Sequence, residues 1–345
     1  MKKINLLFLI IVFIIAGTLR PGTVKASQRH VINDHSHTGA LSDTHIKYFG
    51  RWDFSDTSQY VSYWGGAYFK VDFTGKTVKI KVGNKSNFYA KIDNGPWISF
   101  LAASGTIDLT SVPLSGRKHS LSVAQGKDYN YVFNFQGLIL DAGAKTRNPK
   151  VSPVLIEYIG DSITCGYTDA QADVSGYGWV CSEALGTEHT QIAYPGITLV
   201  SGYPKVGMDT QYFKRQSPAY PASPGWDFSK YTPKIVVINL GTNDNNKAVP
   251  DSILKRTYIA FLTGIRSKFP GAEIFVMRTF LGVKAVPTLA AVTACNTGGD
   301  NKVHYIDTNG WLTKSDYTDG LHPSINGNIK VANLLQPILS PYINN

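Results

Sequence analysis

Cysteine and charged residues are scarce in this sequence. Its 345 residues include only three cysteines, too few for the disulfide framework of a small secreted scaffold and without the spacing of a zinc knuckle. Charged residues make up 17% of the chain and hydrophobic residues 43%, a balance that argues against intrinsic disorder and supplies apolar side chains for packed cores. The length favours two domains over one.

Long hydrophobic runs are absent except at the N-terminus. Lys2 and Lys3 precede an almost unbroken apolar run over residues 4–16, and Val-Lys-Ala at 24–26 places small residues where a signal peptidase cuts. The run is shorter than the roughly 20 residues of a membrane helix. We therefore expect residues 1–26 to be a signal peptide, and the mature protein to be secreted, extracellular and free of the membrane. A signal anchor is the alternative.

The basic excess is small and dispersed. The chain has 34 basic and 24 acidic residues, a net charge of +10, and loss of the four basic residues of the leader lowers this to +6. Because no dense basic stripe is present, nucleic acid is not an expected partner. A mild positive charge is compatible with acidic cell-wall polymers, although an ordinary solvated surface explains it equally well.

The three cysteines permit at most one disulfide. Cys165–Cys181 is the pairing we favour if a bond forms, which would leave Cys295 as a free thiol. Three free thiols are the alternative. In either case we expect Cys165 to be buried.

Short alternating stretches predict an all-β domain over residues 27–142. Polar and apolar residues alternate at 68–73, 78–82, 88–93 and 119–123, with turn-forming residues between the runs. No helical periodicity appears before residue 142, and strands at this spacing are typical of an antiparallel sandwich or barrel. Asn84 begins an Asn-x-Ser sequon at an expected turn. In a eukaryotic host Asn84 would carry a glycan.

The pattern changes after a polar linker at residues 143–152. Apolar runs of the kind buried on both faces of a parallel sheet then alternate with helical periodicity, which predicts an α/β domain over residues 153–345. Strands are expected at 154–159, 234–240, 274–278 and 303–306, and helices at 252–268 and 325–339. We expect Asp251 to cap the first of these helices.

Two motifs directly follow predicted strands of this second domain. Ser162 in Gly-Asp-Ser follows the strand at 154–159, at the sheet edge where α/β folds bind ligands. A helix starting behind Ser162 would place amide donors near it. Asn243 in Gly-Thr-Asn-Asp follows the strand at 234–240, and its side-chain amide is a neutral donor suited to an oxyanion. Taken alone, each motif is also typical of an ordinary turn.

A carboxylate and an imidazole lie three residues apart before the closing helix. Asp319 and His322 can sit side by side in a tight turn, so that one ring nitrogen contacts Asp319 and the other faces Ser162. Tyr-Pro-Gly at 194–196 is a fourth motif, and Gly196 is a candidate backbone donor for an oxyanion hole.

The order of these motifs resembles that of the SGNH, or GDSL-type, hydrolase superfamily. The resemblance implies a three-layer α/β fold and ester hydrolysis, with Ser162 as nucleophile, His322 as general base and Asp319 orienting His322. It also implies an oxyanion hole formed by the Ser162 amide, Gly196 and Asn243. No metal or other cofactor is expected, since no residue cluster has metal-ligand spacing.

A narrower resemblance covers nearly the whole mature chain. Residues 156–167 and 226–244 are similar to the catalytic domain of carbohydrate esterase family 2, and 48–53 with the β-rich stretch behind it is similar to that family's jelly-roll domain. The resemblance implies a serine esterase that removes acetyl groups from plant polysaccharides such as xylan and glucomannan. Leu321 departs from the pattern, because relatives often have an aromatic residue there, and this puts sugar stacking at that point in doubt.

Two other functions are compatible with the residues. A lipid esterase or thioesterase on the same fold would need a long apolar acyl groove. A carbohydrate-binding protein with a vestigial site is the second alternative, and the presence of all four motifs argues against it.

Overall fold

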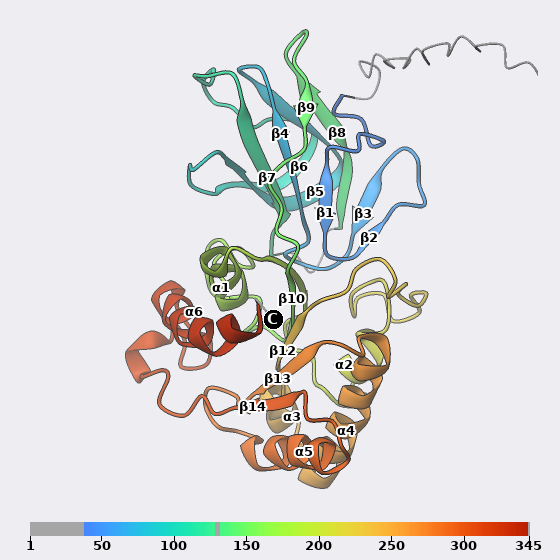
Figure 1. The fold of residues 1–345 in the computed structure, drawn as a ribbon, viewed down its shortest axis with the longest axis vertical. Helices are drawn as coiled ribbons and strands as arrows, with labels where there is room; N and C mark the ends of the chain where they lie inside the picture. Colours follow the sequence, from blue (N-terminus) through green and yellow to red (C-terminus); the bar gives the residue numbers. More distant parts are fainter. Residues whose placement is uncertain (1–37, 128–131, 344–345) are drawn as a thin grey trace, which may run out of the picture. The chain divides into compact units, whose positions relative to one another are not determined.

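The computed structural model describes residues 38–127 and 132–343, which form an antiparallel β domain followed by a parallel α/β domain (Figure 1). This is the predicted fold class; the expected leader at 1–26 lies outside the described residues. The strands of the β domain are β1 (Lys47–Phe49), β2 (Trp52–Asp53), β3 (Tyr60–Ser62), β4 (Tyr68–Phe73), β5 (Val78–Ile92), β6 (Ile98–Asp108), β7 (His119–Gln125), β8 (Phe133–Leu140) and β9 (Thr146–Arg147).

Residue alternation builds the core of the β domain. In the first half of β5, Val78, Ile80 and Val82 are buried while Lys79 and Lys81 are exposed, so one face of the strand packs inward. The strands pair in the order β1-β4-β7-β5-β8-β3-β2, with β6 added to β5 and β9 added to β4. The short β9 therefore lies within the stretch predicted to be a linker.

Strand β5 is longer than the sequence predicted. The expected strands at 78–82 and 88–93 are parts of one strand, Val78–Ile92, whose pairing with β6 shifts register around Ser86. The strand continues because β6, β7 and β8 each hydrogen-bond to part of it. Asn84 is consequently exposed in an irregular section of a strand, and not at the turn that we expected.

The α/β domain contains five described parallel strands in the order β11-β10-β12-β13-β14. They are β10 (Leu155–Gly160), β11 (Glu188–Ala193), β12 (Ile235–Asn239), β13 (Glu273–Met277) and β14 (Val303–Ile306). The helices are α1 (Tyr177–Leu185), α2 (Met208–Gln211), α3 (Thr242–Asn246), α4 (Asp251–Lys268), α5 (Ala285–Thr297) and α6 (Ile325–Leu339). Four of the strands match predicted ones within a residue or two; β11 was not predicted.

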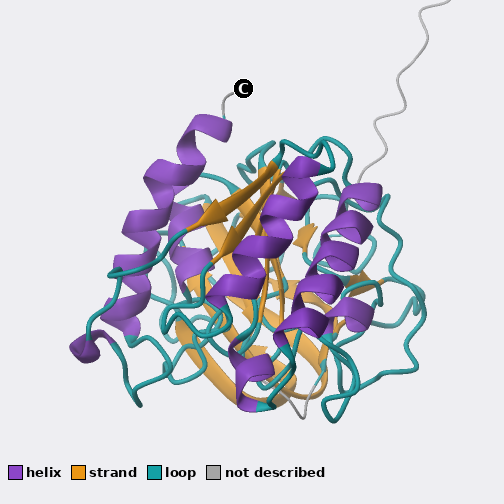
Figure 2. Cartoon of the chain, turned by 90° about the horizontal axis from the view of Figure 1, so that it is seen from below, coloured by secondary structure: helices purple, strands orange, loops and turns teal. Residues whose placement is uncertain are grey.

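Helices cover both faces of the parallel sheet, which gives the three layers that the resemblance implied (Figure 2). Val236 and Ile238 of β12 pack in one cluster with apolar residues of α4 and α5. Ile235 and Val237 of the same strand pack on the other face with residues of α1 and α6. Because both faces are covered, residues 235–238 of the strand are all apolar.

A capping serine explains where α6 begins. The closing helix α6 has the predicted bounds, and the Ser324 hydroxyl at its N-cap accepts from the Gly327 amide at 3.2 Å. Asp251 was expected to cap α4, but it is the first residue of that helix, and its carboxylate instead pairs with Lys284 at 2.7 Å.

The segment behind Ser162 is not a helix. Residues 161–176 form successive turns and α1 begins only at Tyr177, which corrects the expected helix start. The turns are fixed by backbone bonds, such as those from the Tyr167 amide to the Ser162 carbonyl at 3.0 Å and from the Cys165 amide to the Asp161 carbonyl at 3.2 Å.

A buried arginine joins the two domains. Arg51, from the loop between β1 and β2, has no exposed surface, and one guanidinium nitrogen donates to the carbonyls of Tyr212 and Lys214 in the α/β domain. Its guanidinium also lies over the rings of Trp64, Tyr212, Trp226 and Phe228. The β domain is therefore anchored by charge-assisted hydrogen bonds and ring contacts.

All three cysteines are free thiols, so the favoured Cys165–Cys181 pairing is wrong. Cys165 is buried as expected, in the turns behind Ser162, whereas Cys181 is buried on α1 in the cluster that contains Tyr158. Burial raises the pKa of both thiols, which makes them inert packing residues.

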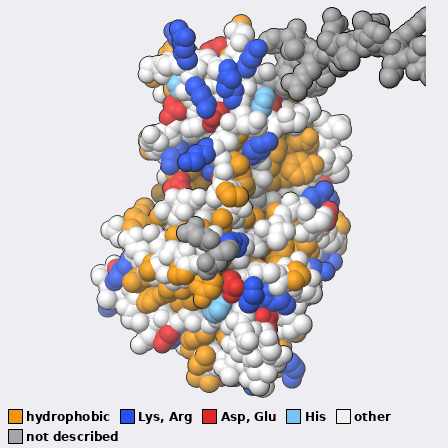
Figure 3. All heavy atoms as spheres, in the orientation of Figure 1, with side chains coloured by type: hydrophobic (Ala, Val, Ile, Leu, Met, Phe, Trp, Pro, Cys, Tyr) orange, Lys and Arg blue, Asp and Glu red, His pale blue; other side chains and the backbone are white. Residues whose placement is uncertain are grey.

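The surface carries mixed charge. Figure 3 shows lysine and arginine side chains lying among acidic ones on the face in view. Over the residues that the structure describes, no helix has the length and apolar character that crossing a bilayer requires.

Candidate active site

Ser162, His322 and Asp319 form one chain of hydrogen bonds. The Ser162 Oγ lies 2.9 Å from His322 Nε2, and His322 Nδ1 lies 2.7 Å from Asp319 Oδ2. Because an ionised carboxylate only accepts, Nδ1 of the neutral ring carries the proton and Nε2 is left to accept from the serine hydroxyl. Ser162 and His322 are each only 8% exposed, so little water competes for this contact.

The turn before α6 presents the histidine. Asp319 Oδ1 accepts from the amides of Leu321 at 3.0 Å and His322 at 2.8 Å, and Gly320 has the positive φ of 81° that the turn requires. Burial alone would raise the pKa of the Asp319 carboxyl, but these amides and the His322 ring outweigh it and lower the pKa to about 2. The carboxylate stays ionised throughout the neutral range.

Three strand ends converge at the serine. Ser162 follows β10, Gly196 follows β11 and Asn243 follows β12, and β10 pairs with both of the others. This is the switch point of the sheet, where chain connections diverge to opposite sides. Gly160 must be a glycine, because a Cβ there would lie 1.9 Å from the Thr164 hydroxyl.

Asn243 is held by the residue before the serine. Its Nδ2 donates to Asp161 Oδ2 at 3.1 Å, and Asp161 Oδ1 accepts from the Ile163 amide at 2.9 Å. Burial raises the pKa of the Asp161 carboxyl to about 7, against the lowering effect of the Ile163 amide and with a further contribution from the charge of Asp244. From the sequence, Asp161 was identified only as part of the Gly-Asp-Ser motif, and its contact with Asn243 was not predicted.

A second carboxylate fixes the loop that carries Gly196. Asp244, directly after Asn243, accepts from the amides of Leu199 at 2.8 Å and Val200 at 3.1 Å. Gly196 has a φ of 78° with open space where a Cβ would be, so backbone conformation and not crowding accounts for the glycine. In the described part of the chain, no hydrogen bond joins Gly196 or Asn243 to Ser162 itself.

Lys127 connects the β domain to the site. The Lys127 Nζ donates to the Tyr167 carbonyl at 2.6 Å and lies 4.2 Å from the centre of the Tyr167 ring. The same ring packs 5.3 Å from the His322 ring. Both residues were missed, because no local pattern in the sequence brings residues 127, 167 and 322 together.

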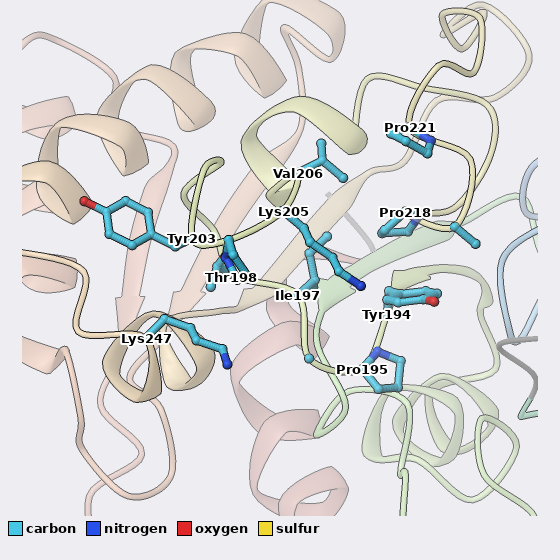
Figure 4. Close-up of a pocket in the computed structure, with 13 residues that line it drawn as sticks. Tyr194, Pro195, Ile197, Thr198, Tyr203, Lys205, Val206, Pro218, Pro221 and Lys247 are labelled. Atoms are coloured by element: carbon cyan, nitrogen blue, oxygen red, sulfur yellow. The ribbon is translucent and has the colours of Figure 1, made fainter.

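A cavity of about 540 Å³ opens at Gly196 (Figure 4). Its lining includes Tyr194, Pro195 and Gly196 on one side and Lys205 and Lys247 on others. Within residues 38–127 and 132–343, no group of three or more His, Cys, Asp or Glu side chains is placed to hold a metal ion.

Comparison with protein families gives a match in each domain. Residues 158–328 match the GDSL-like lipase/acylhydrolase family, and residues 48–149 match the N-terminal domain of carbohydrate esterase 2. The first match contains Ser162, Gly196, Asn243, Asp319 and His322.

Two curated relatives and a solved structure align with most of this chain. A cellulase/esterase, CelE, of Acetivibrio thermocellus is 30% identical over 305 residues, 81% of this chain and 37% of the relative, so the chain spans little more than a third of that protein. An acetylxylan esterase/glucomannan deacetylase of Cellvibrio japonicus is 24% identical over 69% of this chain and 72% of the relative. A family two carbohydrate esterase from Clostridium thermocellum, solved in complex with cellohexaose, superposes with a TM-score of 0.76 at 28% identity, over 86% of this chain and 98% of that one.

Proposed function

We propose that this protein, whose two domains match the GDSL-like lipase/acylhydrolase family and the N-terminal domain of carbohydrate esterase 2, removes acetyl groups from polysaccharides such as xylan and glucomannan. The observation that carries the proposal is the Ser162–His322–Asp319 chain, with contacts of 2.9 and 2.7 Å. This is the geometry in which a serine hydroxyl becomes a nucleophile.

The proposed reaction begins at the serine. Ser162 Oγ attacks the acetyl carbonyl carbon while His322 Nε2 takes the hydroxyl proton, and Asp319 stabilises the imidazolium that forms. The tetrahedral intermediate collapses, and the sugar oxygen leaves with the proton from His322. Water, activated by the same histidine, then releases acetate from Ser162.

Asn243 is prepared for the oxyanion. Its side-chain amide has two N–H groups, and one of them is used by Asp161 at 3.1 Å. The other is left for the negatively charged oxygen of the intermediate, together with the amides of Ser162 and Gly196. A donor of this kind lowers the barrier by about 3 kcal/mol.

The cavity beside Gly196 favours a polar substrate over a long acyl chain. Lys205 and Lys247 line it and are exposed, and a long alkyl chain would have to displace their hydration without replacing it. This argues for a sugar ester over the lipid esterase or thioesterase alternative.

Acetate release tests the proposal. Purified mature protein is incubated with acetylated xylan, acetylated glucomannan and nitrophenyl esters of increasing chain length, with Ser162→Ala as the inactive control. We expect acetate from the polysaccharides and ester turnover that falls steeply beyond about four carbons. Turnover of octanoate esters without acetate release would favour the lipid esterase, and neither activity would favour a vestigial binding protein.

We further propose that the protein acts outside the cell after loss of residues 1–26. The basic start and the short apolar run support this. N-terminal sequencing of protein from the culture medium tests it: a chain that keeps its first residues and remains with the cells would contradict it. In a eukaryotic host, the exposed Asn84 is the proposed glycan acceptor.

A further inference from the structure

The cavity at Gly196 lies beside two residues of the proposed oxyanion hole, Gly196 and Asn243. Gly196 itself lines it, and Lys247 lies one helical turn beyond Asn243, with its amide donating to the Asn243 carbonyl at 2.9 Å. A polymer with an acetylated sugar over Ser162 would therefore pass a neighbouring sugar unit into or across this cavity. The protein can therefore contact that neighbouring sugar unit as well as the ester.

The cavity carries two uncompensated positive charges. Lys205 and Lys247 are both exposed, and among the residues that the structure describes neither has a carboxylate partner. Lys284, in contrast, is paired with Asp251 at 2.7 Å. An unpaired ammonium facing a concave surface attracts an anion more strongly than one on a flat surface.

The acidic residues near the cavity are already engaged by donors. Asp244 accepts the amides of Leu199 and Val200, as described above, and is buried. Asp209 accepts from the amide and the hydroxyl of Ser201. These carboxylates stabilise their own loops and are not paired with the two lysines.

Tyrosine and proline side chains give the wall several flat apolar surfaces. Tyr194 and Pro195 lie on one side, and Pro218 and Pro221 come from a separate loop (Figure 4). The close-up shows Lys205 extending toward Tyr194. Flat apolar walls with a few charged groups suit a sugar ring that carries a charge, since the ring packs on the walls and the charge fixes its orientation.

We infer that this cavity binds a uronic acid unit of the acetylated polysaccharide, with the sugar carboxylate facing Lys205 and Lys247. The inference rests on the proposed function and narrows it to acidic polysaccharides. The expected effect is on substrate binding and not on the acyl transfer itself, because neither lysine belongs to the Ser162–His322–Asp319 chain.

The test compares two substrates that differ only in charge. Acetylated glucuronoxylan is used as isolated and after chemical reduction of its uronate carboxyls to alcohols, with acetyl content matched. Wild-type protein should show a kcat/KM about three- to tenfold higher on the acidic polymer, carried by KM, as expected for two exposed ion pairs. High salt should remove the preference, because it screens such pairs.

Variants locate the preference in the cavity. The double variant Lys205→Gln/Lys247→Gln should treat the two polymers alike, while the control Lys255→Gln, an exposed lysine on α4, should keep the wild-type ratio. Equal kcat/KM of the wild type on both polymers, or a preference that survives in the double variant, would overturn the inference and leave the proposed function intact. If neither polymer released acetate, both the inference and the proposed function would be overturned.

Discussion

At the scale of single residues, the proposed activity depends on the position of one imidazole. Two carboxylate oxygens of Asp319 contact the His322 amide and ring, and this leaves Nε2 facing Ser162 at 2.9 Å. Asp319 is itself partly exposed, with 46% of its side chain in contact with solvent, so its role is orientation and charge stabilisation rather than packing. Replacing it should therefore separate catalysis from stability.

Asp319→Asn should reduce kcat while leaving the fold in place. The asparagine amide oxygen can accept from His322 Nδ1 but carries no negative charge, so the imidazolium is no longer stabilised. Loss of the equivalent carboxylate in a serine protease costs about 10⁴ in kcat. The readout is kcat on nitrophenyl acetate, with Asp227→Asn, at an exposed surface position, as the matched control. A near-normal kcat would mean that Ser162 and His322 act as a dyad.

Asp161→Asn should change how stability depends on pH. The pKa of buried Asp161 is raised to about 7 in the folded state, so between the unfolded value near 3.8 and about 7 the folded state holds a proton that the unfolded state has lost. The free energy of unfolding then falls as pH rises, by up to about 1.4 kcal/mol per pH unit, and the neutral amide removes this contribution.

Urea unfolding of both proteins at pH 4.5 and pH 7.5 measures the difference. The stability of the wild type relative to the variant should be lower at pH 7.5 than at pH 4.5. The pKa of Asp244 is also raised by burial, but this residue is present in both proteins and its contribution largely cancels. A difference that is the same at both pH values would contradict the raised pKa.

At the scale of elements, the strands and helices that were predicted with the right bounds are those that a local sequence pattern determines. β4, β14 and α6 have the predicted bounds, because alternation, apolar runs and a capping serine are local signals. Ser162 and His322 were found in the same way, since each belongs to a short motif at the end or the start of an element.

Strand β11 was missed because its first four residues are polar. His189 on this strand is nevertheless buried, where its ring stacks on that of Tyr68 in the β domain, and burial with the charge of Lys70 lowers its pKa to about 3. Glu188 accepts from the Tyr68 hydroxyl at 2.6 Å and from Lys70 at 2.9 Å. These partners lie more than 100 residues away in the sequence, so no local window could show that the polar residues are satisfied.

The contact between the β domain and the histidine gives a prediction at this scale. Lys127→Gln removes the cation over the Tyr167 ring, which packs on His322, so the ring loses a partner worth about 0.5–2 kcal/mol. We expect kcat/KM to fall about three- to tenfold, because the His322 ring is then less firmly positioned against Ser162.

The readout is kcat/KM on nitrophenyl acetate, with Lys85→Gln, exposed on β5, as the matched control. The same kcat/KM for Lys127→Gln and Lys85→Gln would show that the β domain does not act on the histidine.

At the scale of the whole molecule, the two domains are joined around Arg51. The Tyr231 hydroxyl contacts both Arg51 Nε at 3.5 Å and Glu157 at 2.5 Å, so the guanidinium of one domain and the carboxylate of the other share a buried network. Such a network is sensitive to loss of one member, because the remaining charge stays buried without its partner.

Arg51→Met should lower the free energy of unfolding by about 3–5 kcal/mol, the range for breaking a buried pair. Thermal unfolding of the variant and of the control Arg117→Gln, at an exposed position, measures the effect. The same Tm for both proteins would mean that ring packing alone holds the domains, with no contribution from the charge.

Covalent labelling is the sharpest test of whether Ser162 is a nucleophile activated by His322. The mature protein is treated with a fluorophosphonate, and the modified residue is located by peptide mass mapping, with His322→Ala and Ser162→Ala in parallel. We expect rapid, single-site labelling at Ser162 that slows by orders of magnitude in His322→Ala and is absent in Ser162→Ala. An unlabelled wild-type protein, or labelling at another residue, would contradict it.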